Sequence, residues 1–276
     1  MQLYFAFDSE EFDTALYKVQ CCIEDIHSWM CDNKLLLNSN KTEILLLGRK
    51  TSVTKVPSSA SLYGMDIHSN NSVRSLGVLL DSQLRMEAQV NSLCKSAYFH
   101  LRNIGRIRQH LNCAPLETLV HALVASRMDY CNSLLSGYPK AVINKLQHLQ
   151  NSAARLITLT NKREHITPVL IDLHWLPVTF RIQFKLLLLV FKALHGTAPD
   201  YLSELLIPRS CSRTTRSSTS LLLVQPRTKL VSCGDRAFST LGPKLWNSLP
   251  ANLQNTDSLT VFKSHLKTHS FQLTYP

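Results

Sequence analysis

Acidic side chains are concentrated near the amino terminus, where paired carboxylates could hold metal ions for phosphoryl transfer. Residues 1–48 contain eight acidic and three basic residues. Asp8 and Asp13 lie at the start of a segment with helical periodicity, and no second group of carboxylates stands at a spacing that would complete a two-metal site. We therefore interpret these two residues as a helix cap and part of a solvated helix face, and predict no catalytic residue here.

Histidine and cysteine residues do not form a metal-binding pattern either. His265 and His269 stand four residues apart on a predicted helix, which suits zinc, but Cys211 and Cys233 lie too far upstream and too far from each other to complete a finger. The eight cysteines include no Cys-x-x-Cys pair, and without a secretion signal we expect reduced thiols. His174, beside a tryptophan in an apolar stretch, is interpreted as buried rather than catalytic.

Basic residues dominate the remainder of the chain. The formal net charge is +11, and because residues 1–48 carry −5, residues 49–276 carry +16. Apolar residues recur every three or four positions over residues 90–107, which predicts a long helix, and Lys95, Arg102 and Arg106 share another face of it. Cations one or two helical turns apart can each contact a phosphate of a nucleic acid. The alternative is a solvated face without a ligand.

Two further groups of basic residues are candidates for the same role. Arg155, Lys162 and Arg163 lie toward the far end of a helix that Pro139 is predicted to open. Residues 209–220, RSCSRTTRSSTS, form a basic loop of low complexity without a core-forming pattern. We interpret this loop as a linker or as an arm that lies on nucleic acid.

The elements that must position these residues are mainly helices. Periodicity predicts helices at residues 8–32, 90–107, 114–135 with a break near Met128, 139–157, 166–177 as a short helix and turn, 178–194 and 258–271. Short strands are predicted at residues 35–37, 42–47, 62–68 as a hairpin that turns at Gly64, and 73–80. Asp8 and Glu11 have the spacing of a capping box. No apolar run is long enough to span a membrane.

Several stretches, in this order, resemble the reverse transcriptases of LINE-type (non-LTR) retrotransposons, of the jockey kind. The late-palm pattern of that family is LN-x-x-KTE followed by LGV-x-LD-x-x-L, which corresponds to residues 37–43 and 76–84 here. The resemblance covers nearly the whole chain. The other matching stretches are QLYF at 2–5, SRMDYCNSLLSGYP at 126–139, LQNSAARLI at 149–157, HITPVLIDLHWLPV at 165–178 and LWNSLP at 245–250.

The resemblance implies an α+β, mostly α fold: a partial polymerase palm at residues 1–84, a helical thumb-like region at 85–160 and a helical carboxy-terminal region at 161–276. The palm would contain a helix and short antiparallel strands. In the family, two carboxylate centres of the palm hold the catalytic metal ions, and this chain begins just after the second centre, so both are absent. Lys41 matches a late-palm lysine that resembles the proton donor of polymerases, and Leu76 and Gly77 match the primer-grip turn.

We therefore expect a truncated, retrotransposon-derived RNA-directed DNA polymerase that is catalytically inactive as it stands, with no metal site and no cofactor. Mg²⁺ would be needed only by a full-length active relative. The expected partners are RNA, DNA or an RNA–DNA hybrid, bound with low sequence specificity inside the cell and not at a membrane. One alternative is a domesticated protein-interaction module in which Trp175, Trp246 and the closing helix contact a protein partner. Another is that an upstream exon restores the catalytic hairpin.

Overall fold

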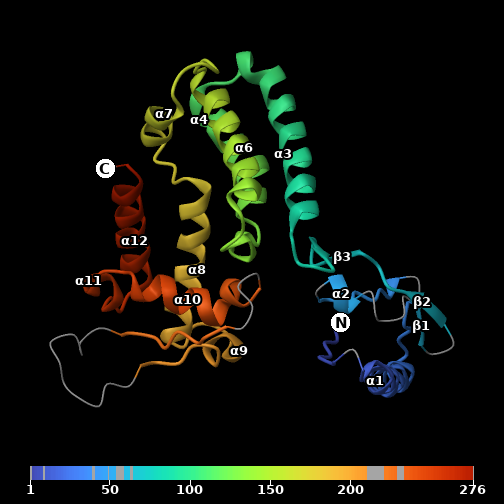
Figure 1. Ribbon diagram of the computed structural model, residues 1–276. Coiled ribbons are helices and arrows are strands. Elements are labelled where there is room, and N and C mark those ends of the chain that lie inside the picture. The colour runs from blue at the N-terminus through green and yellow to red at the C-terminus, as the bar shows by residue number, and fades with distance from the viewer. Residues whose placement is uncertain are drawn as a thin grey trace. The chain divides into compact units, whose positions relative to one another are not determined.

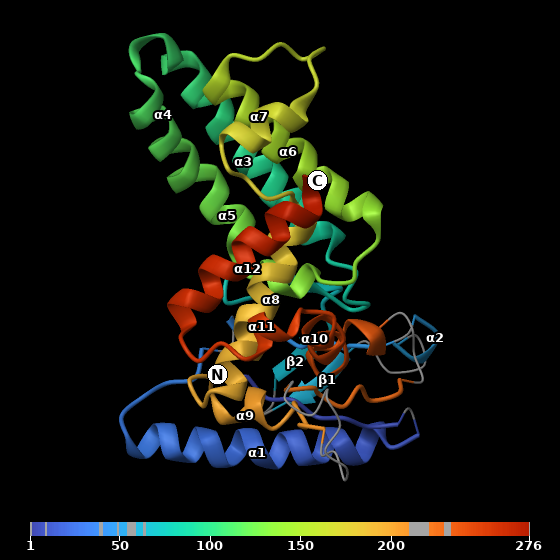
Figure 2. The same cartoon turned by 90° about the vertical axis from the view of Figure 1, so that its left-hand side faces the viewer.

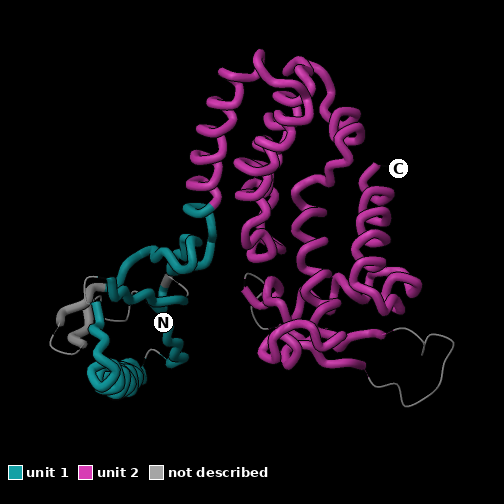
Figure 3. Tube along the Cα trace, turned by 180° about the vertical axis from the view of Figure 1, so that it is seen from behind, with its two compact units in different colours: residues 1–89 teal, residues 90–276 magenta. Residues whose placement is uncertain are grey.

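Two compact units make up the protein: unit 1 contains residues 1–89 and unit 2 contains residues 90–276 (Figure 3). The chain is mostly helical with short antiparallel strands, which confirms the predicted α+β, mostly α class. Most of the basic loop predicted at residues 209–220 lies outside the described residues. The computed structural model describes residues 2–8, 10–38, 41–48, 50–53, 59–62, 65–209, 221–228 and 233–275.

The described residues of unit 1 form one long helix, one short helix and two β-hairpins. The long helix α1 (Phe12–Asp32) ends where the sequence predicts. Its start differs from the prediction, because the side chain of the preceding Glu11 makes no capping hydrogen bond and Asp8 contributes only its backbone carbonyl, to the N–H of Glu11. The other elements are α2 (Lys50–Val53), β1 (Ser59–Leu62), β2 (Met65–His68), β3 (Ser72–Ser75) and β4 (Val78–Asp81).

The strands differ in part from the prediction. β1 pairs with β2 as a hairpin that begins at residue 59 instead of the predicted residue 62, and the turn predicted at Gly64 lies outside the described residues. The single strand predicted at residues 73–80 is a second hairpin, β3–β4. It turns at Leu76 and Gly77, whose φ angles of 47° and 85° suit a two-residue turn. The strands predicted at residues 35–37 and 42–47 are wrong: in the described part of unit 1 this region makes one isolated bridge, between Ile44 and Ser69. A single bridge without a neighbouring strand cannot extend into a ladder.

Asp81 fixes the path from β4 into the next helix, α3 (Glu87–Ile107). Its two carboxylate oxygens accept the backbone N–H groups of Arg85 and Met86, each at 2.8 Å. The backbone N–H of Leu79 in turn donates to Oε1 of Gln89, on the first turns of α3, at 2.9 Å. The acidic residue at the end of the LGV-x-LD stretch therefore has a structural role.

Unit 2 is built from helices, most of which are labelled in Figure 1. The predicted helix at residues 114–135 is helical to Asp129 and includes a π-helical turn; it breaks just after Met128, as predicted, and Cys131 then takes a φ of 52°. The elements after α3 are η2 (Arg108–His110), α4 (Cys113–Val120), η3 (His121–Ala125), α5 (Ser126–Asp129), η4 (Asn132–Leu135), α6 (Lys140–Thr158), α7 (Ile166–Asp172), α8 (Val178–Leu194), α9 (Asp200–Ser203), η5 (Gly234–Arg236), α10 (Phe238–Asn247), α11 (Ala251–Gln254) and α12 (Leu259–Thr274).

Two hydrophobic clusters form the core of unit 2. The first joins α3, α4, α6 and α7 through residues such as Leu101, Leu149 and Trp175. The second surrounds the carboxy-terminal half of α8 and includes Trp246 and Phe262, and Figures 1 and 2 both show α12 running alongside α8. Helix α8 is apolar nearly all round, so it can be buried between elements on several sides, as its sequence predicts.

Candidate nucleic-acid interface

The three basic residues predicted to share one helix face lie together on the exposed side of α3. Lys95, Arg102 and Arg106 are all exposed. At 100° per residue, their spacing places all three within an arc of about 40° around the helix axis. The buried residues of the same helix lie on the other side and are Val90, Ala97, Leu101 and Ile104. The amphipathic pattern thus gives one face to the core and leaves the cations in solvent.

Polar contacts tie α3 to α6 near both ends of α3. At the carboxy-terminal end, the Arg108 guanidinium donates from Nε to the carbonyl of Leu156 and from Nη2 to that of Ile157, each at 3.2 Å. These carbonyls belong to the last turn of α6, where helix carbonyls lack partners within the helix. Near the other end, Nζ of Lys145 donates to Oδ1 of Asn91 at 2.8 Å. The basic face of α3 is therefore carried by a helix that is held at two points.

Cys94 lies on α3 and packs against the first hydrophobic cluster. Burial raises the pKa of its thiol, and the nearby ammonium of Lys145 opposes this effect only in part. The thiol is therefore protonated at neutral pH and is a weak nucleophile.

The second predicted group of basic residues is divided between two roles. Arg155 is half-buried, and its guanidinium donates to the backbone carbonyls of Asn161 at 3.3 Å and Glu164 at 3.1 Å. It thereby holds the turn that follows α6. Lys162 and Arg163 lie in that turn and are exposed. Of these three side chains, the latter two are therefore better placed to contact a ligand in solvent.

Two aromatic side chains on α3 were not among the residues singled out from the sequence. Phe99 is 58% exposed and Tyr98 is 39% exposed. Phe99 stands four residues after Lys95 and three before Arg102, so it lies within the same stripe as the cations. The signal was available in the sequence: both aromatics fall outside the apolar positions that predict the buried face. The face thus combines positive charge with an exposed aromatic ring.

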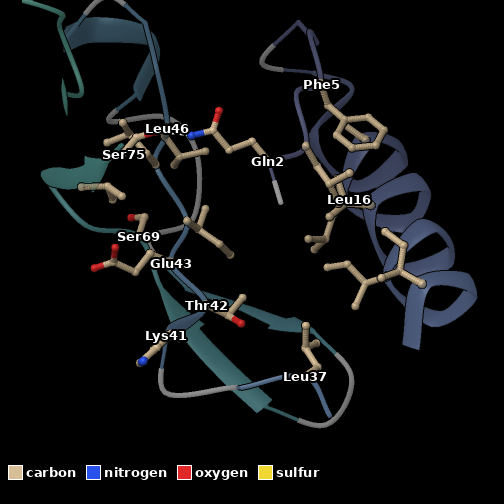
Figure 4. A pocket seen from close by; sticks show the side chains of 18 of the residues that line it. Gln2, Phe5, Leu16, Leu37, Lys41, Thr42, Glu43, Leu46, Ser69 and Ser75 are labelled. Atoms are coloured by element: carbon tan, nitrogen blue, oxygen red, sulfur yellow. Dashed lines mark hydrogen bonds between the residues drawn. The ribbon is translucent and has the colours of Figure 1, made fainter. Parts of the chain in front are cut away.

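The residues matched to late-palm motifs lie in unit 1, around a cavity of about 850 Å³. Lys41 and Leu76 both line it, and Leu76 is 82% exposed at the tip of the β3–β4 turn. In Figure 4, Leu16 of α1 and Phe5 lie on one side of this cavity, and Leu46 and the β3–β4 region lie on the other. Its lining is mostly apolar and includes the inward residues of α1. The segments matched to the motifs therefore meet in unit 1, with Gly77 next to Leu76 in the turn.

Histidine and tryptophan residues in unit 2 correct two expectations. His174 is exposed, not buried, because it takes a left-handed φ of 54° in the turn after α7, and it lines a second cavity of about 490 Å³. Trp175 and Trp246 are 5% and 0% exposed, so they belong to the core and do not offer a surface to a protein partner. Nε1 of Trp246 donates to the carbonyl of Leu221 at 2.6 Å, and the hydroxyl of Tyr275 donates to the carbonyl of Trp175 at 3.0 Å.

No group of three or more histidine, cysteine, aspartate or glutamate side chains able to hold a metal ion occurs among the described residues. None of the helices in the described part of the chain has both the length and the apolar character that a membrane span requires. Comparison of the chain with protein families, curated proteins and solved structures gives no match.

Proposed function

We propose that this protein binds nucleic acids without sequence preference through the exposed face of α3, and that it derives from a LINE-type reverse transcriptase. The observation that carries the binding proposal is the alignment of Lys95, Arg102 and Arg106 on one exposed face of a helix whose other face is core. The ordered series of matching motifs, from QLYF at residues 2–5 to LWNSLP at residues 245–250, supports the derivation. The proposed activity is binding to RNA, DNA or their hybrid, and not polymerisation.

The energetic basis of this binding is electrostatic. Each cation that neutralises a phosphate releases condensed counterions, which stabilises the complex at low salt for any sequence. Lys162 and Arg163 extend the charged region, because the Arg108 contacts place the end of α3 beside the end of α6 that their turn follows. Arg155 supports them by holding that turn.

A first prediction concerns the salt dependence of binding. Fluorescence anisotropy of a labelled RNA–DNA primer–template, titrated with the protein at several salt concentrations, should give micromolar or tighter binding. The logarithm of the affinity should fall linearly with the logarithm of the salt concentration. Replacing Lys95, Arg102 and Arg106 together by alanine should weaken binding and reduce the slope by about 2 to 3, because three phosphate contacts are lost.

The matched control removes the same charge elsewhere in unit 2. Lys140 on α6, Lys185 on α8 and Lys263 on α12 are also exposed, and their triple alanine variant has the same net charge as the α3 variant. It should retain most of the affinity if binding is local to α3. Equal losses in the two triple variants would indicate a diffuse charge effect, and no binding by the folded wild type at low salt would refute the proposal.

A protein-interaction function is the second candidate, and the exposed apolar residues of unit 1 favour it. Since Trp175 and Trp246 are buried, the surface for a partner would be the apolar cavity of unit 1. Leu36 and Trp29 are further exposed apolar residues of the same unit. Exposed apolar patches mark interaction sites. Binding of a partner to such a surface is insensitive to salt, which distinguishes it from binding to a phosphate backbone.

A further inference from the structure

We propose that the α3 face is a stacking platform for single-stranded nucleic acid, with Phe99 as the residue on which a base stacks. This inference rests on the proposed function and names the class of nucleic acid that the same site selects. The stripe consists of Lys95, Phe99, Arg102 and Arg106, which we call the α3 stripe. In an α-helix, steps of four, three and four residues keep these four positions within an arc of about 60° around the helix axis.

The exposure of Phe99 is the first argument. A phenylalanine that is 58% exposed on a helix whose other face contributes four buried residues is not needed for the core. Its ring contacts the His100 ring edge-on, with 5.5 Å between centroids, which leaves most of the ring in solvent. An exposed ring offers a π-face to which a nucleobase can stack, and it does so for any base sequence.

The position of the ring between cations is the second argument. At a rise of about 1.5 Å per residue, Phe99 stands about 6 Å along the helix from Lys95 and about 4.5 Å from Arg102. A single strand that follows the helix with phosphates at these cations therefore has bases within reach of Phe99. Tyr98, 39% exposed, precedes Phe99 on α3 and adds a second exposed ring beside the stripe.

Duplexes do not satisfy this arrangement. In a double helix the faces of the bases are stacked on one another, and a protein surface reaches only base edges and the backbone. Single strands expose base faces, and proteins that bind them combine a positively charged track with aromatic side chains. The aromatic residue within the cation stripe thus adds affinity for single strands and none for duplexes, whereas the cations add affinity for both.

The test compares single-stranded and duplex oligonucleotides of about 12 base positions on the full-length protein. Phe99→Ala should weaken binding to a labelled single strand by roughly five- to hundredfold and leave binding to the duplex of the same sequence unchanged. Phe99→Trp should bind the single strand about as tightly as the wild type does. The fluorescence of the added tryptophan should be quenched by the single strand and not by the duplex. Circular dichroism of each variant verifies the fold.

Tyr201→Ala provides the matched control, because Tyr201 is 67% exposed on α9 of the same unit and lies outside the α3 stripe. It should bind both oligonucleotides as the wild type does. If the wild type binds both forms and Phe99→Ala weakens neither, or weakens both equally, the stacking proposal is wrong while binding through the cations stands. If the folded wild type binds neither form, the proposed function fails and the stacking proposal fails with it.

Discussion

At the scale of residues, two arginines near the end of α3 have opposite roles although their types are the same. Arg102 is exposed, whereas Arg108 is half-buried and donates to backbone carbonyls of Leu156 and Ile157. We predict that Arg108→Ala lowers the free energy of unfolding by about 1 to 3 kcal/mol, because the charged hydrogen bonds are lost and the carbonyls keep no protein partner. Urea unfolding followed by circular dichroism measures this change.

Arg102→Ala, on α3 six residues before Arg108, is the control, and it should change stability by less than about 0.5 kcal/mol, as surface substitutions do. Affinity for nucleic acid should respond in the opposite order, with the larger loss in Arg102→Ala. Equal destabilisation by the two substitutions would show that the hydrogen bonds of Arg108 contribute nothing to stability.

Residue-scale prediction from the sequence succeeded where periodicity decides the outcome. The stripe of Ile143, Leu146, Leu149 and Ala153 on α6 is buried as expected. The same periodicity could not reveal Gln150, which is fully buried because its side chain donates to the carbonyl of Leu176 at 2.9 Å. That partner is 26 residues away in the sequence, and no local pattern indicates such a contact.

At the scale of elements, the β3–β4 hairpin depends on its turn. Leu76 has a φ of 47° and Gly77 a φ of 85°, and asparagine tolerates such a conformation better than leucine. We predict that Leu76→Asn slows hydrogen exchange of the β3–β4 amides, which corresponds to a stabilisation of about 0.5 to 1 kcal/mol. Gly77→Ala places a Cβ on a residue with positive φ and should speed exchange at the same amides. Similar exchange in the two variants would contradict this description of the turn.

Element prediction from the sequence was more accurate in unit 2 than in unit 1. Helix α8 has the predicted bounds, and the predicted helices that became α6 and α12 differ only at their ends. Helices form their hydrogen bonds within a local segment, so a local pattern suffices. Strands need partners from elsewhere in the chain, and the segment at residues 42–47 makes one bridge instead of a ladder.

At the scale of the whole molecule, the two units differ in the amount of buried side-chain surface. Among the described side chains of residues 2–89, Val78 and Met86 are buried, whereas unit 2 has two hydrophobic clusters. Charge follows the same division, with acidic residues concentrated in residues 8–32 and basic residues later in the chain. Short strands without neighbouring strands leave open edges and a bare apolar face, which accounts for the exposed apolar residues of unit 1.

We therefore predict that the units differ when they are produced separately. A fragment of residues 81–276 retains Asp81, whose carboxylate accepts the N–H groups at the start of α3, and should be helical and melt cooperatively. A fragment of residues 1–86 should show no cooperative transition, should bind the dye ANS and should aggregate. Its apolar residues are too few to form a core that removes them from water. A soluble, monomeric 1–86 fragment with a sharp thermal transition would contradict the prediction.

Since the α3 stripe belongs to the 81–276 fragment, that fragment should also keep the full affinity for single strands, whereas a loss of binding would show that unit 1 contributes to the interface.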